Sequence, residues 1–176
     1  QTLRRHLLAL DALPEAPLVA AVPMSIRAEA ERRTATLLEG LAGSGTVALV
    51  DEATPPPDTG PVDHVVSVAW LATQDDLDAA VARLVRLLGE RGRLHVVEPT
   101  AGADLVARLQ RWAATVAQRR TGWRIDRDVP AATRRAGLVL TDMERFSMPV
   151  PSPVLRPWIQ GTARVRPDLT AGEVER

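Results

Sequence analysis

The sequence has 176 residues, of which 45% are hydrophobic and 25% charged, so its composition is that of one globular domain and not of a fibrous or disordered chain. Its 22 basic and 22 acidic residues cancel, which argues against a nucleic-acid binder, because such proteins usually carry a basic excess that contacts phosphates. No apolar run is long enough for a membrane span, and no signal-peptide pattern opens the chain.

Missing residue types exclude several kinds of chemistry. The chain has no Cys, which excludes disulfides, thiolate metal sites and cysteine nucleophiles. Every basic residue is Arg, and the absence of Lys excludes Schiff-base enzymes and phosphate-loop NTPases. Three scattered His residues do not predict a metal site. These features are compatible with a reducing compartment, and we expect a cytoplasmic protein.

The N-terminal third predicts helices that alternate with short strands. Residues 2–13 have leucines at helical spacing, and residues 18–22 (LVAAV) form a short apolar run typical of a buried strand. A helix is expected over residues 25–40 with Ser25 as its N-cap, followed by a strand at residues 46–50. The chain begins with Gln1 and not with an initiator Met, which favours the interpretation that residues precede it.

The rest of the chain continues the alternation. Strands are predicted at residues 62–71 and 93–99, and at 138–146 and 158–165. Helices are predicted at residues 75–90, where Gly89 and Gly92 would end the helix, and at 104–119 and 126–136. We therefore expect an α/β domain over residues 1–166 with a mostly parallel sheet and an antiparallel C-terminal strand pair, followed by a polar tail at 167–176.

Residues 47–99 contain, in this order, an acidic pair after a strand, PDTG, VDHVVS, an amphipathic helix, and LGERGRL followed by HVVEP. In this order and spacing they resemble the class I S-adenosylmethionine-dependent methyltransferases. Residues 121–165 are similar to the helix, glycine turn and closing antiparallel strands of the family's small-molecule and lipid or thiol branch. The resemblance implies a Rossmann-like methyltransferase sheet, with S-adenosylmethionine as cofactor.

The N-terminal third fits the family in two registers. In the preferred register, residues 18–34 resemble the family's second strand and its helix, so the glycine-rich cofactor loop would precede Gln1 and the N-terminal strand would be missing. In the other register, residues 18–23 are the first strand, and one strand–helix unit is deleted. In the preferred register Pro23 replaces an acidic residue that binds the cofactor ribose, and a Pro23→Asp change should improve cofactor binding. In the other register the same change should weaken it.

The resemblance also assigns candidate site residues. The cofactor would contact Pro23, Met24, Asp51, Glu52, Ser67 and Val68. For Asp51 and Glu52 the alternative is a solvated pair that opens a proline-rich loop. Trp70 would line the substrate mouth, although packing beneath a helix is the alternative, and Trp123 and Trp158 would furnish an apolar acceptor pocket.

Other distinctive side chains are interpreted structurally. Trp112 is expected in the core. His6 and His64 are expected at the surface or in satisfied positions, and His95 inside a strand. The paired arginines are expected on solvated helix faces.

Two functions follow as hypotheses. The first is methyl transfer from S-adenosylmethionine to a small organic or lipid-like acceptor, with no catalytic residue assigned. The alternative is an inactive methyltransferase-like domain that serves as a partner or scaffold subunit, in a homodimer or a heteromer.

Overall fold

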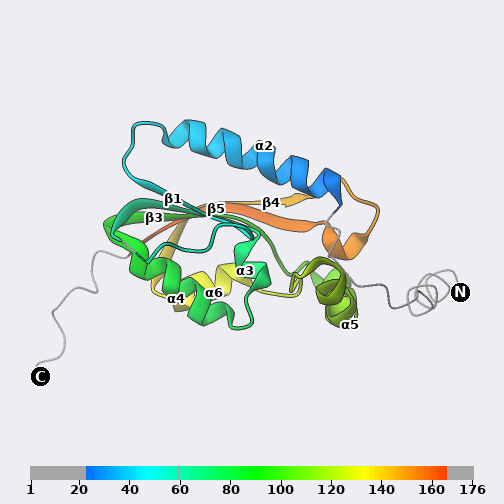
Figure 1. The fold of residues 1–176 in the computed structure, drawn as a ribbon. Helices are drawn as coiled ribbons and strands as arrows, with labels where there is room; N and C mark the ends of the chain where they lie inside the picture. Colours follow the sequence, from blue (N-terminus) through cyan, green and yellow to red (C-terminus); the bar gives the residue numbers. More distant parts are fainter. Residues whose placement is uncertain (1–22, 59, 166–176) are drawn as a thin grey trace, which may run out of the picture.

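The computed structural model describes residues 23–58 and 60–165 (Figure 1). The predicted helix at residues 2–13, the predicted strand at 18–22 and the polar tail lie outside the described residues. The elements in chain order are α2 (Met24–Leu41), β1 (Val47–Val50), β2 (Val62–Val68), α3 (Trp70–Thr73), α4 (Leu77–Leu87), β3 (Leu88–Pro99), α5 (Asp104–Thr121), α6 (Val129–Arg135), β4 (Leu138–Ser147), the 3-10 helix η1 (Pro153–Leu155) and β5 (Pro157–Val165).

Five strands form a single sheet in the order β1-β2-β3-β5-β4. Strands β1, β2 and β3 are parallel, whereas β5 runs antiparallel to both β3 and β4. In the last pair Leu138 lies opposite Val165, and Met143 lies opposite Gly161. The predicted mostly parallel sheet with an antiparallel C-terminal strand pair is therefore confirmed.

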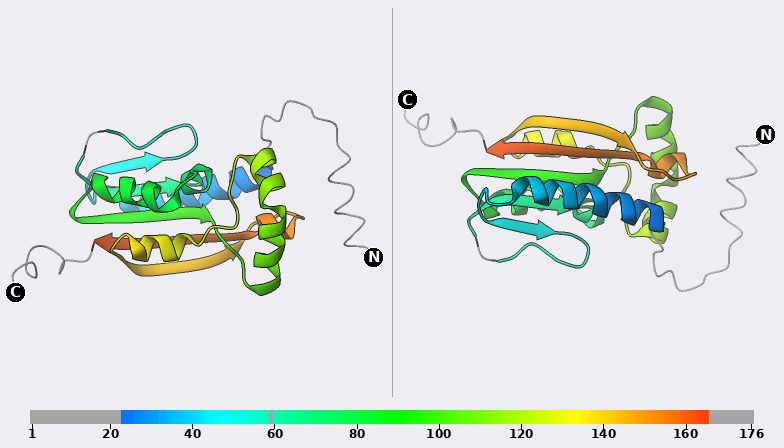
Figure 2. Two further views of the ribbon diagram at one scale, coloured as in Figure 1. Left: turned by 90° about the horizontal axis from the view of Figure 1, so that it is seen from below. Right: turned by 90° about the horizontal axis from the view of Figure 1, so that it is seen from above.

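The two faces of the sheet are covered unequally. Helix α2 crosses one face alone, and α3, α4 and α6 cover the other (Figures 1 and 2). Helix α5 lies at the end of the molecule where the three parallel strands end. Strand β1 is at the edge of the sheet and pairs directly with β2. Within the described residues no strand lies between these two. The two registers differ in the role of residues 18–22, which lie outside the described residues, so both stay predictions.

The core on the α4 side is mostly aliphatic. Val65 and Leu94 from the sheet pack with Leu84 of α4, and all three side chains are fully buried. The apolar stripe predicted for α4 forms this contact, and Asp76 caps the helix by accepting a hydrogen bond from the Ala79 amide. The helix ends at Leu87, earlier than predicted, and Gly92 lies within β3, where a Cβ would come within 2.8 Å of the Leu88 Cβ.

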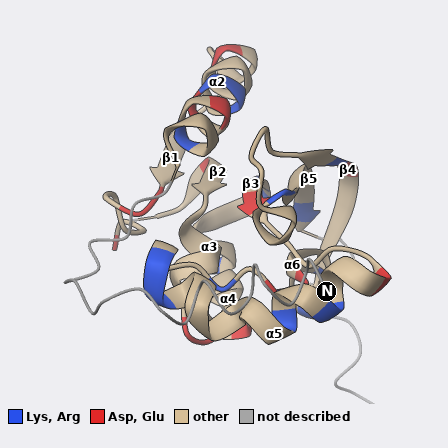
Figure 3. Ribbon diagram, turned by 90° about the vertical axis from the view of Figure 1, so that its right-hand side faces the viewer, with Lys and Arg blue, Asp and Glu red and all other residues tan. Residues whose placement is uncertain are grey.

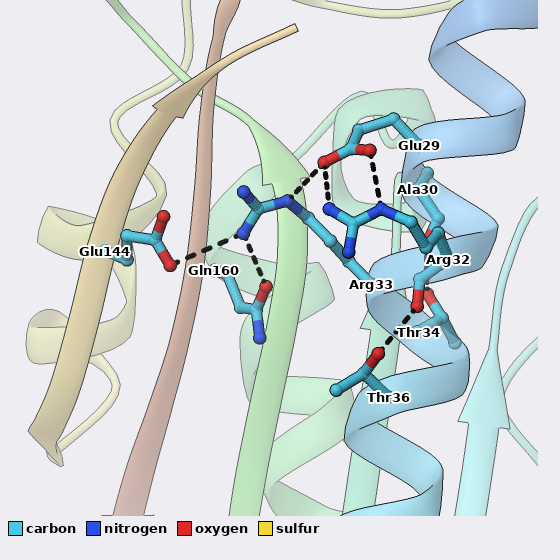
Figure 4. A network of polar contacts seen from close by, with 8 residues as sticks. All are labelled: Glu29, Ala30, Arg32, Arg33, Thr34, Thr36, Glu144 and Gln160. Carbon is cyan, nitrogen blue, oxygen red and sulfur yellow. Dashed lines mark hydrogen bonds and ion pairs between the residues drawn. The ribbon is translucent and has the colours of Figure 1, made fainter.

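Helix α2 is fastened to the sheet by directional contacts (Figure 4). It begins at Met24 after Pro23, so the predicted N-cap residue Ser25 lies inside the helix. The Arg33 guanidinium donates to Glu29 on its own helix and to Gln160 on β5, at 2.8 and 3.0 Å. It also stacks 3.6 Å from the centre of the Phe146 ring on β4. Hydrogen bonds from Arg32 and Arg33 lower the pKa of Glu29 to about 2, so this carboxylate stays charged.

A row of polar side chains lies in the sheet on the α2 side. The Nδ1 of His64 lies 3.1 Å from the Nε2 of His95. The Nδ1 of His95 lies 3.0 Å from the Thr162 hydroxyl. Both rings are buried, and burial lowers the pKa of His95 to about 4, with the neighbouring His64 and Arg93 adding to the effect. The structural interpretation of both histidines agrees with this placement.

Candidate functional site: a groove at the carboxyl ends of the strands

A groove of about 400 Å³ lies between α2 and the carboxyl ends of β1 and β2. Its volume lies within the range of small-molecule sites. The lining residues are Ile26, Arg27, Ala30, Glu31, Thr34, Ala35, Leu38, Leu49, Asp51, Glu52, Ala53, Val68, Ala69, Trp123 and Trp158. Open α/β sheets bind ligands at this end of their strands, because loops that leave adjacent strands form a crevice there.

Asp51 leads the chain out of β1 in a fixed turn. Its Oδ1 accepts hydrogen bonds from the amides of Ala53 and Thr54 at 2.9 and 2.7 Å, and its own amide donates to the Thr54 carbonyl. Side chains of Asp commonly hold turns in this way. One carboxylate oxygen is engaged by the turn, so the other remains for a ligand in the groove.

An aromatic wall closes one side of the groove. The rings of Trp123 and Trp158 meet edge to face, with centroids 5.5 Å apart and planes inclined by 76°. The indole N–H of Trp123 donates to Glu52, and that of Trp158 donates to the Leu155 carbonyl. Because both indole donors are engaged, the two rings offer the groove an apolar surface.

Five of the nine site residues named from the sequence line this groove: Asp51, Glu52, Val68, Trp123 and Trp158. They come from segments that the chain separates by more than a hundred positions, and the sheet order brings them together. Pro23 precedes the first turn of α2, and the Met24 side chain is 85% exposed beside it. Neither of these two lines the groove.

Trp70 and Ser67 lie on the other face of the sheet. Ala69 adopts a left-handed conformation with φ of 53°, and the chain then turns into α3. Trp70 is consequently 5% exposed and packs in the aliphatic core beside α4, which is the alternative weighed for it. Ser67 is fully buried and donates its hydroxyl proton to Glu98 at 2.6 Å. These two side chains are therefore not in the groove.

Glu98 is the residue that sequence reasoning missed. Its side chain is fully buried at the end of β3, where it accepts hydrogen bonds from Ser67 and from the amides of Leu71 and Ala72. Burial raises the pKa of this carboxyl to about 7, although the hydrogen bonds oppose the shift. Glu98 is the acidic residue of HVVEP, one of the motifs that carry the family resemblance, and that motif could have identified it as a candidate.

Glu98 also positions the groove indirectly. It fixes the first amides of α3, and the Ala72 carbonyl of α3 accepts the amide of Arg124 at 2.7 Å. Arg124 follows Trp123, so the aromatic wall is joined by backbone to the segment that Glu98 holds. A buried carboxylate outside the groove thus sets the place of one of its walls.

The expectation for Trp112 is wrong. This side chain is 59% exposed on α5, because the face that α5 turns toward the domain is formed by smaller residues. No group of His, Cys, Asp and Glu within residues 23–58 and 60–165 is arranged to hold a metal ion. In the same part of the chain, no helix has the length and apolar character needed to cross a membrane.

Comparisons with known proteins bear on the fold. Neither protein-family models nor curated proteins give a match to the sequence. Among solved structures, LepI in complex with SAM is similar, with a TM-score of 0.50 and 8% identity over 93% of this chain and 52% of LepI. A SAM-dependent methyltransferase from Thermotoga maritima is similar with a TM-score of 0.46 and 13% identity. This match covers 62% of this chain and 60% of that protein. The N-methyltransferase NodS from Bradyrhizobium japonicum, in complex with S-adenosyl-L-homocysteine, is similar with a TM-score of 0.41 and 15% identity. This match covers 62% of this chain and 48% of NodS.

The chain spans between 48% and 60% of the length of these three proteins. Identities this low relate folds and not activities, since one fold supports many functions. The topology of the described sheet agrees with the likeness, because parallel strands are followed by an antiparallel C-terminal pair. The described residues therefore have a Rossmann-like α/β fold, similar to that of LepI.

Proposed function

We propose that the groove binds S-adenosylmethionine and that the protein transfers a methyl group to a small organic or lipid-like acceptor. The observation that carries the proposal is the joining of two carboxylates, Asp51 and Glu52, with an aromatic wall at the carboxyl ends of β1 and β2. A methyltransferase-type sheet supports the choice of cofactor at the level of the fold.

The residues of the groove fit the parts of this cofactor. Asp51 and Glu52 can accept hydrogen bonds from ribose hydroxyls or from the amino group of the purine. Ala30, Leu49 and Val68 line the groove with apolar side chains against which a purine can pack. Arg27, at the end of the groove near the start of α2, can pair with a carboxylate. Pro23, Met24 and Ser67 remain proposed contributors that would act from the rim or through neighbours.

When bound, the cofactor supplies a methyl group that is already activated for displacement. The protein would then orient the donor and the acceptor in line, which can lower the barrier by several kcal/mol without any catalytic triad. The apolar wall and α2 would exclude water from the reacting atoms. Trp70 lies in the core, so the acceptor would be held by Trp123 and Trp158.

A second candidate is a methyltransferase-like domain that binds a partner and performs no chemistry. Two observations favour it. Pro23 offers neither a carboxylate nor an N–H, and among the described residues the glycine-rich stretch GLAGSG joins α2 to β1 at the amino ends of the strands, away from the groove.

Calorimetric titration of the full chain with S-adenosylmethionine and S-adenosylhomocysteine separates the two candidates. We expect both compounds to bind. The Asp51→Asn variant keeps an oxygen for the Ala53 and Thr54 amides but loses its charge, so it should bind about tenfold more weakly, the difference between charged and neutral hydrogen bonds. The matched control is Glu90→Gln, an exposed carboxylate at the opposite end of the sheet. Absence of binding at millimolar ligand would leave the scaffold function.

A further inference from the structure

Helix α5 turns its largest apolar side chains away from the domain. Leu105 and Trp112 are 68% and 59% exposed, and Leu109 and Val116 are half-buried. These four positions follow a helical spacing of four, three and four residues, so they form one stripe along the helix. The side chains that α5 buries are Gln110, Ala117 and Thr121. The helix therefore fully buries only small and polar residues, and it leaves Leu105 and Trp112 exposed.

Gln110 holds the helix in this orientation. Its side chain is fully buried at the middle of the inward face. Its Oε1 accepts the Gly102 amide at 2.7 Å, and its Nε2 donates to the carbonyls of Thr100 and Val154 at 3.1 Å. Rotating the exposed stripe inward would leave these buried polar groups without partners, which is costly. The outward stripe is thus a fixed feature of the fold.

Arginines border the exposed stripe on both sides. At 100° per residue, Arg108 and Arg119 fall on one flank and Arg120 falls on the other, with Arg111 further round. Asp104 is the one acidic residue in the helix. None of the four arginines takes part in an ion pair found within residues 23–58 and 60–165. Figure 3 views this end of the molecule and shows that α5 lies at its surface.

We propose that α5 binds an anionic lipid surface, lying in the plane of the interface with its stripe among the acyl chains. An apolar stripe with Trp and Leu, bordered by basic residues, is the pattern of interfacial helices. The long arginine stems can lie along the apolar layer while their guanidinium groups reach lipid phosphates. A second copy of the chain is a poorer occupant, because two such faces would bring their arginines together.

Vesicle sedimentation tests the proposal with the full chain. Phosphatidylcholine vesicles are compared with vesicles that also contain phosphatidylglycerol, in low and high salt. We expect binding only to the anionic vesicles, weakened by salt because counterions screen the arginines. Three of the four tryptophans, Trp70, Trp123 and Trp158, are no more than 5% exposed, so a blue shift of the emission on binding reports Trp112. Equal sedimentation with both kinds of vesicle, or binding without this shift, would overturn the proposal.

Two variants sharpen the test. Trp112→Ser should abolish the emission shift and weaken binding at least tenfold, without loss of stability, because the side chain is exposed. Arg108→Gln with Arg119→Gln should weaken binding roughly 30-fold, since each basic residue near such a surface contributes about fivefold. The control pair, Arg86→Gln with Arg91→Gln, removes the same charge from exposed positions outside α5 and should bind like the wild type.

The control pair also supplies an outcome against the proposal. Weakening as large as that of the α5 pair would show that net charge alone drives the attraction. Light scattering measures the oligomeric state and so tests the alternative occupant, a second copy of the chain. A wild-type dimer that becomes a monomer with Trp112→Ser would identify α5 as a protein interface instead.

Discussion

The two faces of the sheet are stabilised in different ways. The α4 face has a sealed aliphatic core in which Leu84, Val65 and Leu94 are fully buried. The α2 face has a single helix, a core that includes Trp123 and Trp158, and a groove between the helix and the edge of the sheet. Contacts of Arg33 with β4 and β5 attach α2. The sealed face supplies stability, and the open face supplies space for a ligand.

The largest effect is expected for truncations that compare the two cores. Leu84→Ala should lower the free energy of unfolding by about 3 kcal/mol, because it leaves a cavity in a closed core. Ile26→Ala removes an equally buried side chain but opens onto the groove, where solvent can enter, so about 2 kcal/mol is expected. Urea denaturation measures both losses. A greater loss for Ile26→Ala would contradict the contrast between the faces.

The pH dependence of stability should report the ionisation of Glu98, the buried carboxyl at the end of β3. The pKa of Glu98 is raised from 4.5 to about 7, so its contribution to stability is complete below pH 4.5 and is lost as the pH rises through 7. Glu98→Gln stays neutral and should lack this loss. We expect the difference in unfolding free energy, wild type minus variant, to fall between about pH 4.5 and 7.

That difference isolates Glu98 from the histidine on the α2 face. The pKa of His95 is lowered to about 4, so its contribution is present above pH 6.5 and is lost as the pH falls through 4, the opposite direction. Both proteins contain His95, so its contribution cancels in the subtraction. A pH-independent difference would mean that Glu98 does not titrate in this range.

The attachment of α2 should depend on Arg33 and not on its neighbour. Arg33→Gln removes the stacking on Phe146 and the ion pair with Glu29, and about 1 to 1.5 kcal/mol of stability should be lost. Arg32→Gln is the matched control, because Arg32 also pairs with Glu29 but is 62% exposed. Its loss should be clearly smaller than that of Arg33→Gln, because solvent screens an exposed ion pair. Equal losses in thermal unfolding would show that the contacts with β4 and β5 add nothing.

The smallest effect is expected at the start of α2. No side chain caps this helix, and Pro23 occupies the N-cap position. Asp is among the best N-cap residues, so Pro23→Asp should be more stable than Pro23→Ala by about 1 kcal/mol. The alanine variant corrects for the loss of proline rigidity, which acts on the unfolded chain. No difference between the two in chemical denaturation would show that the start of α2 is frayed.

Local sequence patterns determined the elements and much of their pairing. The spacing of Leu77, Val81 and Leu84 specified the helix that covers one face, because a period of 3.6 residues leaves one side apolar. The two β-rich segments around a proline-rich connection specified the C-terminal antiparallel pair. These patterns can be recognised in the sequence because they depend on residues that are close together along the chain.

Tertiary structure decided which side chains form the site. Trp70 and Trp123 were both expected to line a pocket, yet the left-handed turn at Ala69 carries Trp70 into the core, while the backbone contact of Arg124 with α3 places Trp123 on the wall. Glu98 could not be recognised as a central polar residue, because its partners, Ser67 on β2 and the amides of Leu71 and Ala72 on α3, meet it only in the folded chain. Trp112 stays exposed because Gln110, buried against distant carbonyls, fixes the rotation of α5. The sequence determines which faces are apolar, but which face meets a neighbour depends on contacts between residues far apart in the chain.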